Sequence, residues 1–307
     1  MLDFNVFLLS GGTRVPVHVG AVQALEEGGA RVSAWAGVSG GSLVASVYAC
    51  GYSTEQATDL MLKTDYRRLL DPSPVSLIRR MGLYAGRRME HWLDRVFEGR
   101  KFRDLDVPLA VLATDVATGG PFVFSNERTP DIKLATAVRC SMSLPGIFAI
   151  PYVDGHALVD GCFAPSTPKL LFPDSERPTV VVRMEESEPK RNGLPRALSR
   201  RGYVFHVANL VIRNLKPLSH PELWDYHVRV PVGSASSLKF DMTHEQKWDL
   251  FHRGHTACKA ALADAVLDFA GSNFASAYVI GDELSSSDTS DSIDVTAVFG
   301  SPAGHPG

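Results

Sequence analysis

The sequence contains few cysteines, no excess of positive charge and no pattern typical of a metal site. Four cysteines occur in 307 residues, with neither CxxC spacing nor a zinc-like cluster with histidine: Cys50, Cys140, Cys162 and Cys258. We therefore expect no metal, and we interpret the cysteines as small apolar residues of a protein in a reducing, cytoplasmic compartment. The formal net charge of −3 gives no support to a nucleic-acid partner.

We expect neither a signal peptide nor a membrane-spanning segment, and the glycine motifs of nucleotide-binding proteins are missing from the sequence. The apolar residues 4–9 are too few for the hydrophobic region of a signal peptide, and no run approaches the length needed to cross a bilayer. These absences predict a soluble protein whose contact with a membrane would be peripheral. The GxGxxG and P-loop patterns are missing, and we expect no cofactor.

The composition predicts one large domain. Because 45% of the residues are hydrophobic, the chain can bury a sizeable core. We assign residues 1–280 to a single domain, with a helical, cap-like insertion at 63–103. Residues 281–307 are rich in serine, aspartate and glycine, and predict a flexible polar tail.

The first fifty residues alternate strand and helix. Residues 5–9 predict a strand, a helix begins at Pro16 and ends before Gly28-Gly29, and a second strand from Val32 leads into another helix. This order argues for an α/β fold with a mostly parallel sheet. Later patterns predict a strand at 107–116 with residues 122–124 beside it, a helix capped by Asp131, a strand at 179–182, a helical stretch within 196–215, and helices with capping boxes at Ser53 and Thr243.

A serine lies where the second strand turns directly into a helix. Ser39 occupies the centre of Gly37-x-Ser39-x-Gly41, after an apolar strand and before apolar residues at helical spacing. Such a turn strains the serine backbone and requires glycine at the flanking positions, and it exposes the serine hydroxyl at a helix N-terminus. The pattern favours a nucleophile elbow, although a strand–helix junction without chemistry has the same residues.

The glycine loop after the first strand and a later aspartate are candidates to complete the site. Gly11 and Gly12 are adjacent at a strand end, which suits backbone N–H groups that approach a substrate oxygen closely. Asp160 follows an apolar strand end, and in a water-poor pocket its pKa would rise until it could accept the serine proton. A simple Asp-Gly turn is the alternative. His18 and His255 are the other candidate bases, and each lies within a predicted helix, where a lone histidine is more often packed or solvated.

The segment 63–103 is basic although the protein as a whole is acidic. Its arginines alternate with leucines and aromatic residues. One interpretation is an amphipathic cap that contacts an anionic lipid surface. The other is a group of helices with ordinary solvated faces that cover the core.

Five segments in this order resemble the patatin-like phospholipases. The resemblance covers residues 5–170 and continues weakly over 243–262. Each segment alone is common, whereas the ordered set is specific to the family. The segments are Leu9-Ser-Gly-Gly-Thr-Arg14, Gly37-Val-Ser-Gly-Gly41, Ala113-Thr-Asp-Val116, Arg139-Cys-Ser-Met-Ser-Leu-Pro-Gly-Ile-Phe148 and Val159-Asp-Gly161.

The resemblance implies a three-layer α/β/α fold and a Ser39–Asp160 dyad without histidine. It implies calcium-independent hydrolysis of acyl esters, with phospholipids, lysophospholipids or neutral glycerolipids as the lipid substrate. Asp115 would be structural, and Arg14 would help to shape the anion site. The glycine loop is one residue shorter than is usual in the family, and we predict the N–H groups of Gly11, Gly12 and Thr13 as the oxyanion hole.

Two other functions fit the same residues. An acyltransferase would pass the acyl group to an alcohol or a thiol instead of water. A lipid-binding or partner-binding module would keep the fold without turnover. The sequence does not indicate the lipid head group, the acyl chain length or the oligomeric state.

Overall fold

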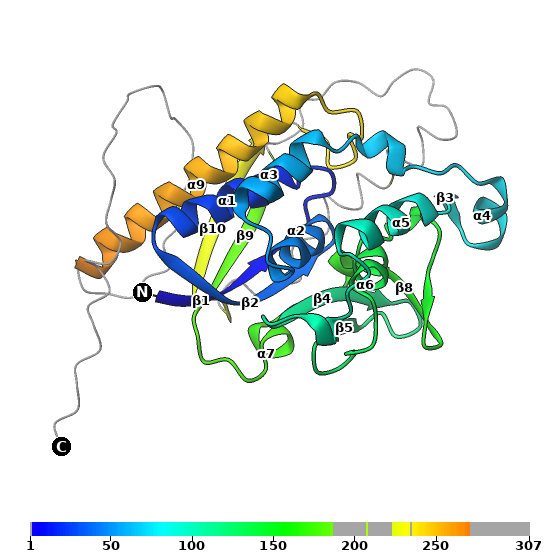
Figure 1. Cartoon of the computed structure of the whole chain (residues 1–307), viewed down its shortest axis with the longest axis horizontal. Coiled ribbons are helices and arrows are strands. Elements are labelled where there is room, and N and C mark those ends of the chain that lie inside the picture. Colours follow the sequence, from blue (N-terminus) through cyan, green and yellow to red (C-terminus); the bar gives the residue numbers. More distant parts are fainter. Residues whose placement is uncertain (1, 187–206, 208–222, 234, 271–307) are drawn as a thin grey trace.

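A mostly parallel sheet lies at the centre of the molecule (Figure 1). The computed structural model describes residues 2–186, 207, 223–233 and 235–270. The strands follow the spatial order β10-β9-β1-β2-β4-β8-β7, and β5 pairs with β4 outside this path. Their bounds are β1 Leu2–Leu8, β2 Ala30–Val38, β4 Leu109–Asp115, β5 Pro121–Ser125, β7 Tyr152–Val153, β8 His156–Asp160, β9 Thr179–Glu186 and β10 Tyr226–Gly233.

The direction of the strands determines where the site can form. β1 pairs in parallel with β2 and with β9, β9 with β10, and β2 with β4, whereas β5, β7 and β8 are antiparallel additions. The carboxyl ends of β1, β2 and β4 therefore meet at one edge of the sheet, which is where parallel α/β sheets carry ligands. The predicted α/β fold with a mostly parallel sheet is confirmed.

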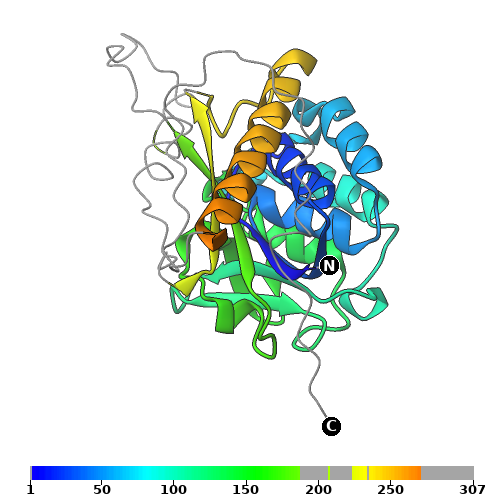
Figure 2. The ribbon, with the colours of Figure 1, turned by 90° about the vertical axis from the view of Figure 1, so that its left-hand side faces the viewer.

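Helices cover both faces of this sheet. On one face α1 (Pro16–Glu27) runs alongside α9 (His244–Ala270), and α2 (Gly40–Ala49) and α3 (Thr54–Lys63) lie next to α1 (Figures 1 and 2). On the other face α7 (Pro168–Leu171) and Trp224 pack against a second apolar cluster. Since both faces are buried, the central strands consist of continuous apolar residues, as is typical of parallel sheets.

The segment 63–103 folds into short elements that are tied to the core. These are η1 (Tyr66–Leu69), α4 (Pro74–Arg79), β3 (Gly82–Tyr84), α5 (Arg87–Val96) and η2 (Phe102–Asp104). The strand β3 pairs in parallel with β6 (Gly146–Phe148), which follows α6 (Leu134–Ser141). Among the described residues, every helix is too short or too polar to span a bilayer.

Most local predictions are confirmed, and one helix start is wrong. Ser53 and Thr243 form the predicted capping boxes. Asp131, by contrast, does not cap a helix: α6 begins at Leu134, because the backbone before it bonds to residues 100–103 in an extended conformation. The strand β10 has no counterpart among the predictions. The expected helical stretch within 196–215 and the tail at 281–307 lie outside the described residues, apart from residue 207.

Candidate active site

Ser39 sits at a strained turn between β2 and α2. Its backbone has φ 54° and ψ −129°, a region that non-glycine residues rarely adopt. A Cβ at Gly37 would lie 2.5 Å from the Ser42 Cα, and a Cβ at Gly41 would lie 2.1 Å from the Leu8 carbonyl oxygen. Both flanking positions therefore require glycine, as the elbow pattern predicts.

Ser141 holds this turn from the side of α6. The Ser39 N–H donates to the Ser141 hydroxyl over 2.8 Å, and that hydroxyl donates to the Leu112 carbonyl over 2.6 Å. The Ser42 hydroxyl also donates to the Ser39 carbonyl, over 2.6 Å. These buried bonds, one to Ser141 of α6 and one from Ser42 of α2, fix the strained conformation. Ser141 belongs to a segment that carries the family resemblance, but the sequence alone does not indicate its contact with Ser39.

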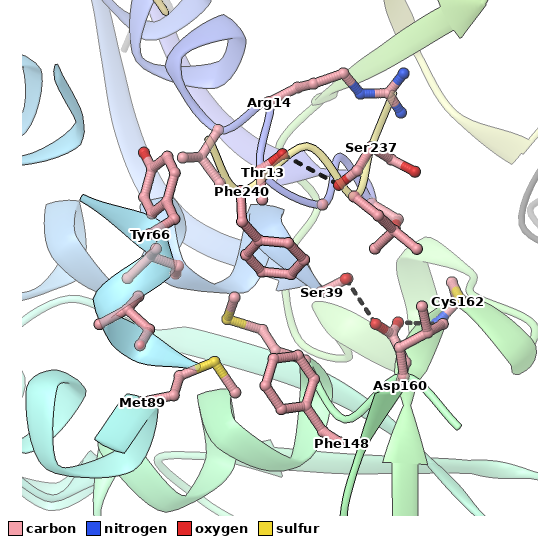
Figure 3. A pocket seen from close by; sticks show the side chains of 18 of the residues that line it. Thr13, Arg14, Ser39, Tyr66, Met89, Phe148, Asp160, Cys162, Ser237 and Phe240 are labelled. Atoms are coloured by element: carbon pink, nitrogen blue, oxygen red, sulfur yellow. Dashed lines mark hydrogen bonds between the residues drawn. The ribbon is translucent and has the colours of Figure 1, made fainter. Parts of the chain in front are cut away.

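The structure brings Ser39 and Asp160 together. The Ser39 hydroxyl donates to Asp160 Oδ2 over 2.7 Å, and the Cys162 N–H donates to Asp160 Oδ1 over 3.0 Å (Figure 3). The sheet register explains the contact, because β2 pairs with β4 and β4 pairs with β8, whose last residue is Asp160. The Thr114 hydroxyl also donates to the Asp160 carbonyl, which fixes the end of β8.

The environment of Asp160 makes it a stronger base than an ordinary carboxylate. The residue is only 3% exposed, and burial raises its pKa from 3.8 to about 6. Hydrogen bonds from the Cys162 N–H and from Ser39 lower the pKa, but by less than burial raises it. A carboxylate with this pKa is deprotonated at neutral pH and still has useful affinity for the serine proton.

The glycine loop lies over the N-terminus of α2. A Cβ at Gly40 would be 2.5 Å from the Gly12 carbonyl oxygen, and Gly12 itself has φ 57°. Within the described residues, the N–H groups of Gly11 and Gly12 have no hydrogen-bond partner. The Thr13 N–H differs from the prediction, because it donates to the Ser237 carbonyl over 2.8 Å. The candidate oxyanion donors in this conformation are therefore Gly11 and Gly12.

Arg14 supports the loop and does not face the reacting groups. Its guanidinium donates to Glu186 over 2.7 Å and to the carbonyls of Ala235 and Gly11 over 3.1 Å each. The side chain points away from Ser39 (Figure 3). Through these bonds Arg14 holds the backbone of the glycine loop.

The two candidate histidines contact other groups. His18 Nε2 lies 2.7 Å from the Leu9 carbonyl oxygen, and burial lowers the pKa of this ring to about 4. His255 Nε2 lies 2.7 Å from Glu27 Oε2. Asp160 is thus the only one of the three candidate bases in contact with the Ser39 hydroxyl.

Asp115 has local structural partners. It accepts hydrogen bonds from the N–H groups of Ala117 and Thr118 and lies 2.5 Å from His156 Nδ1. These bonds close the turn after β4. They are consistent with the structural role that the resemblance implies.

A predominantly apolar pocket opens onto the dyad. Its empty space, together with solvent at the open mouth, amounts to about 790 Å³. Three parts of the chain supply its apolar wall: the segment 63–103, residues at the starts of α1 and α2 together with residues 142–148 after α6, and the loop after β10. The apolar lining residues are Val15, Leu43, Tyr66, Leu69, Met89, Trp92, Met142, Leu144, Phe148, Leu238 and Phe240.

The loop after β10 is the part of the site that the sequence analysis missed. Ser237, Leu238 and Phe240 line the pocket, and a Cβ at Gly12 would lie 2.0 Å from the Ser237 carbonyl oxygen. No motif marks this loop. The only signal is its position directly before the capping box at Thr243.

Solved structures and curated relatives are similar to this chain. The crystal structure of VipD from Legionella pneumophila superposes with a TM-score of 0.59 at 15% identity, covering 85% of this chain and 67% of VipD. The uncharacterised protein YqhO of Bacillus subtilis (strain 168) is 28% identical over 282 residues, which are 80% of this chain and 92% of YqhO. An uncharacterised NTE family protein of Mycobacterium tuberculosis is 33% identical over 191 residues, which are 61% of this chain and 51% of that protein.

The likeness to VipD supports the three-layer α/β/α fold seen in the sheet and its helices. A family model described as patatin-like phospholipase matches residues 6–171, which is more than half of the 307 residues. The match includes the glycine loop, the elbow and the aspartate at the end of β8. This chain therefore belongs to the patatin-like phospholipase family.

Proposed function

We propose that this protein is a lipid acyl hydrolase that cleaves carboxylic esters of phospholipids or lysophospholipids through Ser39, Asp160 and an acyl-enzyme. The observation that carries the proposal is the 2.7 Å hydrogen bond from a strained, buried serine to a carboxylate that burial has made more basic. Membership of the family supports a lipid ester as the substrate class.

In the first step Asp160 accepts the proton of Ser39 while the hydroxyl oxygen attacks the ester carbonyl carbon. The carbonyl oxygen becomes negatively charged and accepts hydrogen bonds from the N–H groups of Gly11 and Gly12. The carbon–oxygen bond to the leaving alcohol then breaks, and Asp160 returns the proton to that alcohol. The acyl group remains on Ser39 as an ester.

In the second step water replaces the alcohol. Asp160 accepts a proton from the water, whose oxygen attacks the acyl carbonyl carbon, and the same N–H groups stabilise the new oxyanion. The bond to Ser39 breaks, its oxygen regains a proton from Asp160, and the fatty acid leaves. The apolar wall of the pocket, which includes Leu43 and Phe240, is suited to the acyl chain of the substrate. Contact with this wall removes the acyl chain from water.

Hydrolysis of a p-nitrophenyl ester and of phospholipid tests the proposal. Ser39→Ala and Asp160→Asn should each lower turnover by at least about a hundredfold and leave the fold intact. Ser46→Ala and Asp154→Asn are matched controls, because Ser46 is a buried serine whose hydroxyl has no partner in the described structure and Asp154 is an exposed turn residue. Full activity of Asp160→Asn would contradict the dyad.

Product analysis with an added alcohol, and labelling with a fluorophosphonate probe, separate the rival functions. An acyltransferase would give an acylated alcohol when an alcohol acceptor is added, whereas a hydrolase gives mainly free fatty acid. A lipid-binding module without turnover would release no product from any ester and would not react with a fluorophosphonate probe at Ser39.

A further inference from the structure

Four large apolar side chains are exposed together on and beside α4. Val75, Leu77, Ile78 and Met81 are 62%, 49%, 82% and 71% exposed, respectively, and we call them the apolar tip. They occur within seven consecutive residues, of which Ser76 is the only buried one. The helix α4 projects at one end of the molecule, away from the sheet (Figure 1). Exposed apolar side chains gathered in this way mark a surface that contacts a lipid or a protein.

Four exposed arginines lie within or shortly after the segment that carries the apolar tip. Arg79 and Arg80 belong to the same segment, and Arg87 and Arg88 begin α5. All four are exposed, and within the described residues none lies within ion-pair distance of a carboxylate. We call these four residues the basic rim. Apolar side chains bordered by arginines match the chemistry of a bilayer, whose anionic head groups lie above an apolar interior.

The apolar tip and the wall of the pocket belong to one continuous segment of the chain. The chain leaves this wall at Leu69 and returns to it at Met89, and α4 lies between the two. The buried guanidinium of Arg139 holds the end of this segment against the core. It donates to the carbonyls of Ala85 and Gly86 and to the carbonyl of Ala149. A membrane contact at the tip would therefore involve a segment that is continuous in the chain with the wall of the pocket.

We propose that the apolar tip inserts into the surface of a bilayer that contains anionic phospholipids, with the basic rim against the head groups. The charge of the rim favours such a bilayer over a second copy of this chain, whose net charge is only −3. The inference deepens the proposed function, since it identifies the surface that meets the lipid substrate. Binding to a bilayer needs no turnover, however, and can be measured without it.

Vesicle sedimentation with the full chain tests the proposal in a Ser39→Ala background. The probes are vesicles of phosphatidylcholine alone and of phosphatidylcholine mixed with phosphatidylglycerol. The protein should bind the mixed vesicles more tightly, and Ile78→Asp combined with Met81→Asp should weaken this binding at least about tenfold. Arg79→Glu combined with Arg80→Glu should remove the preference for phosphatidylglycerol. Trp248→Asp on α9, which changes an exposed apolar residue outside the tip, should bind as the parent does.

Circular dichroism should confirm that each variant is folded. Equal vesicle binding by the parent and the Ile78→Asp/Met81→Asp variant would overturn the proposal. A dimer in solution that the same variant dissociates would also overturn it, because a second copy of the chain would then cover the tip. If the protein with Ser39 intact hydrolyses no ester but vesicle binding still depends on the tip, the membrane contact is supported and the proposed function is contradicted. The failure of one proposal can therefore be distinguished from the failure of the other.

Discussion

The protonation state of Asp160 links the burial of this residue to the pH range of activity. Burial raises its pKa to about 6, and the proposed reaction requires the deprotonated carboxylate. We predict that kcat/KM for a soluble ester is constant above pH 7 and falls about tenfold per pH unit below pH 6. Initial rates between pH 4.5 and 8.5 check this, with circular dichroism at each pH to confirm folding. Constant activity down to pH 5 would contradict Asp160 as the base.

The same pKa makes a prediction about stability. The pKa of Asp160 is about 6 in the folded protein, above the ordinary aspartate value of 3.8. Between pH 3.8 and pH 6 the folded protein therefore binds more protons than the unfolded chain, and its stability falls as the pH rises through this range. Asp160→Asn removes the buried charge and should stabilise the protein at pH 8, by up to about 3 kcal/mol. At pH 4 the gain should vanish.

Thermal unfolding of Asp160→Asn at pH 4 and pH 8 measures this effect. The exposed Asp154→Asn variant is the control, and its unfolding temperature should differ little from that of the parent at either pH. A lower unfolding temperature of Asp160→Asn at pH 8 would show that the carboxylate stabilises the fold, which contradicts the cause that we assign to its pKa.

At the scale of elements, the turn from β2 into α2 leaves no room for a side chain on either side of Ser39. An added Cβ at Gly37 would lie 2.5 Å from a backbone atom of α2, and one at Gly41 would lie 2.1 Å from a backbone atom of β1. We predict that Gly37→Ala and Gly41→Ala each lower the free energy of unfolding by about 3 kcal/mol. Gly120→Ala is the control, because the nearest atom to its Cβ would be the Thr118 hydroxyl at 3.3 Å. Denaturant unfolding that shows equal stability for all three variants would contradict the steric argument.

Local sequence patterns predicted the elements where local bonds determine them. The capping boxes at Ser53 and Thr243 satisfy their own helix termini, so their positions can be inferred from four residues. Asp131 has a similar local pattern, yet the strand-like bonds to residues 100–103 prevail there. Such bonds depend on how two distant segments pack, which a local pattern does not contain.

The site was predictable to the extent that motifs mark it. Ser39 and Asp160 each stand in a motif of the family, and the resemblance to that family implied their contact. The bond from Thr13 to Ser237 joins residues 224 positions apart, and no motif marks its second partner. As a result the loop after β10, and the loss of Thr13 as a free donor, emerge only from the structure.

At the scale of the whole molecule, the site depends on contacts between the two ends of the described chain. A Cβ at Gly20 would lie 2.0 Å from the Phe251 carbonyl oxygen, and one at Gly254 would lie 2.0 Å from the Val17 carbonyl oxygen. The close packing of α1 and α9 thereby anchors the loop after β10 next to the glycine loop. The segment 63–103 closes the pocket from the opposite side and carries the apolar tip.

Reaction with a fluorophosphonate probe, mapped by mass spectrometry, tests whether Asp160 activates Ser39. The probe reacts with a serine hydroxyl only where a base activates it and an oxyanion is stabilised. We predict one probe per chain, attached to Ser39, with the rate of labelling lowered at least about a hundredfold by Asp160→Asn and unchanged by Asp154→Asn. Labelling of another residue, or labelling of Asp160→Asn at the parent rate, would contradict a dyad of Ser39 and Asp160.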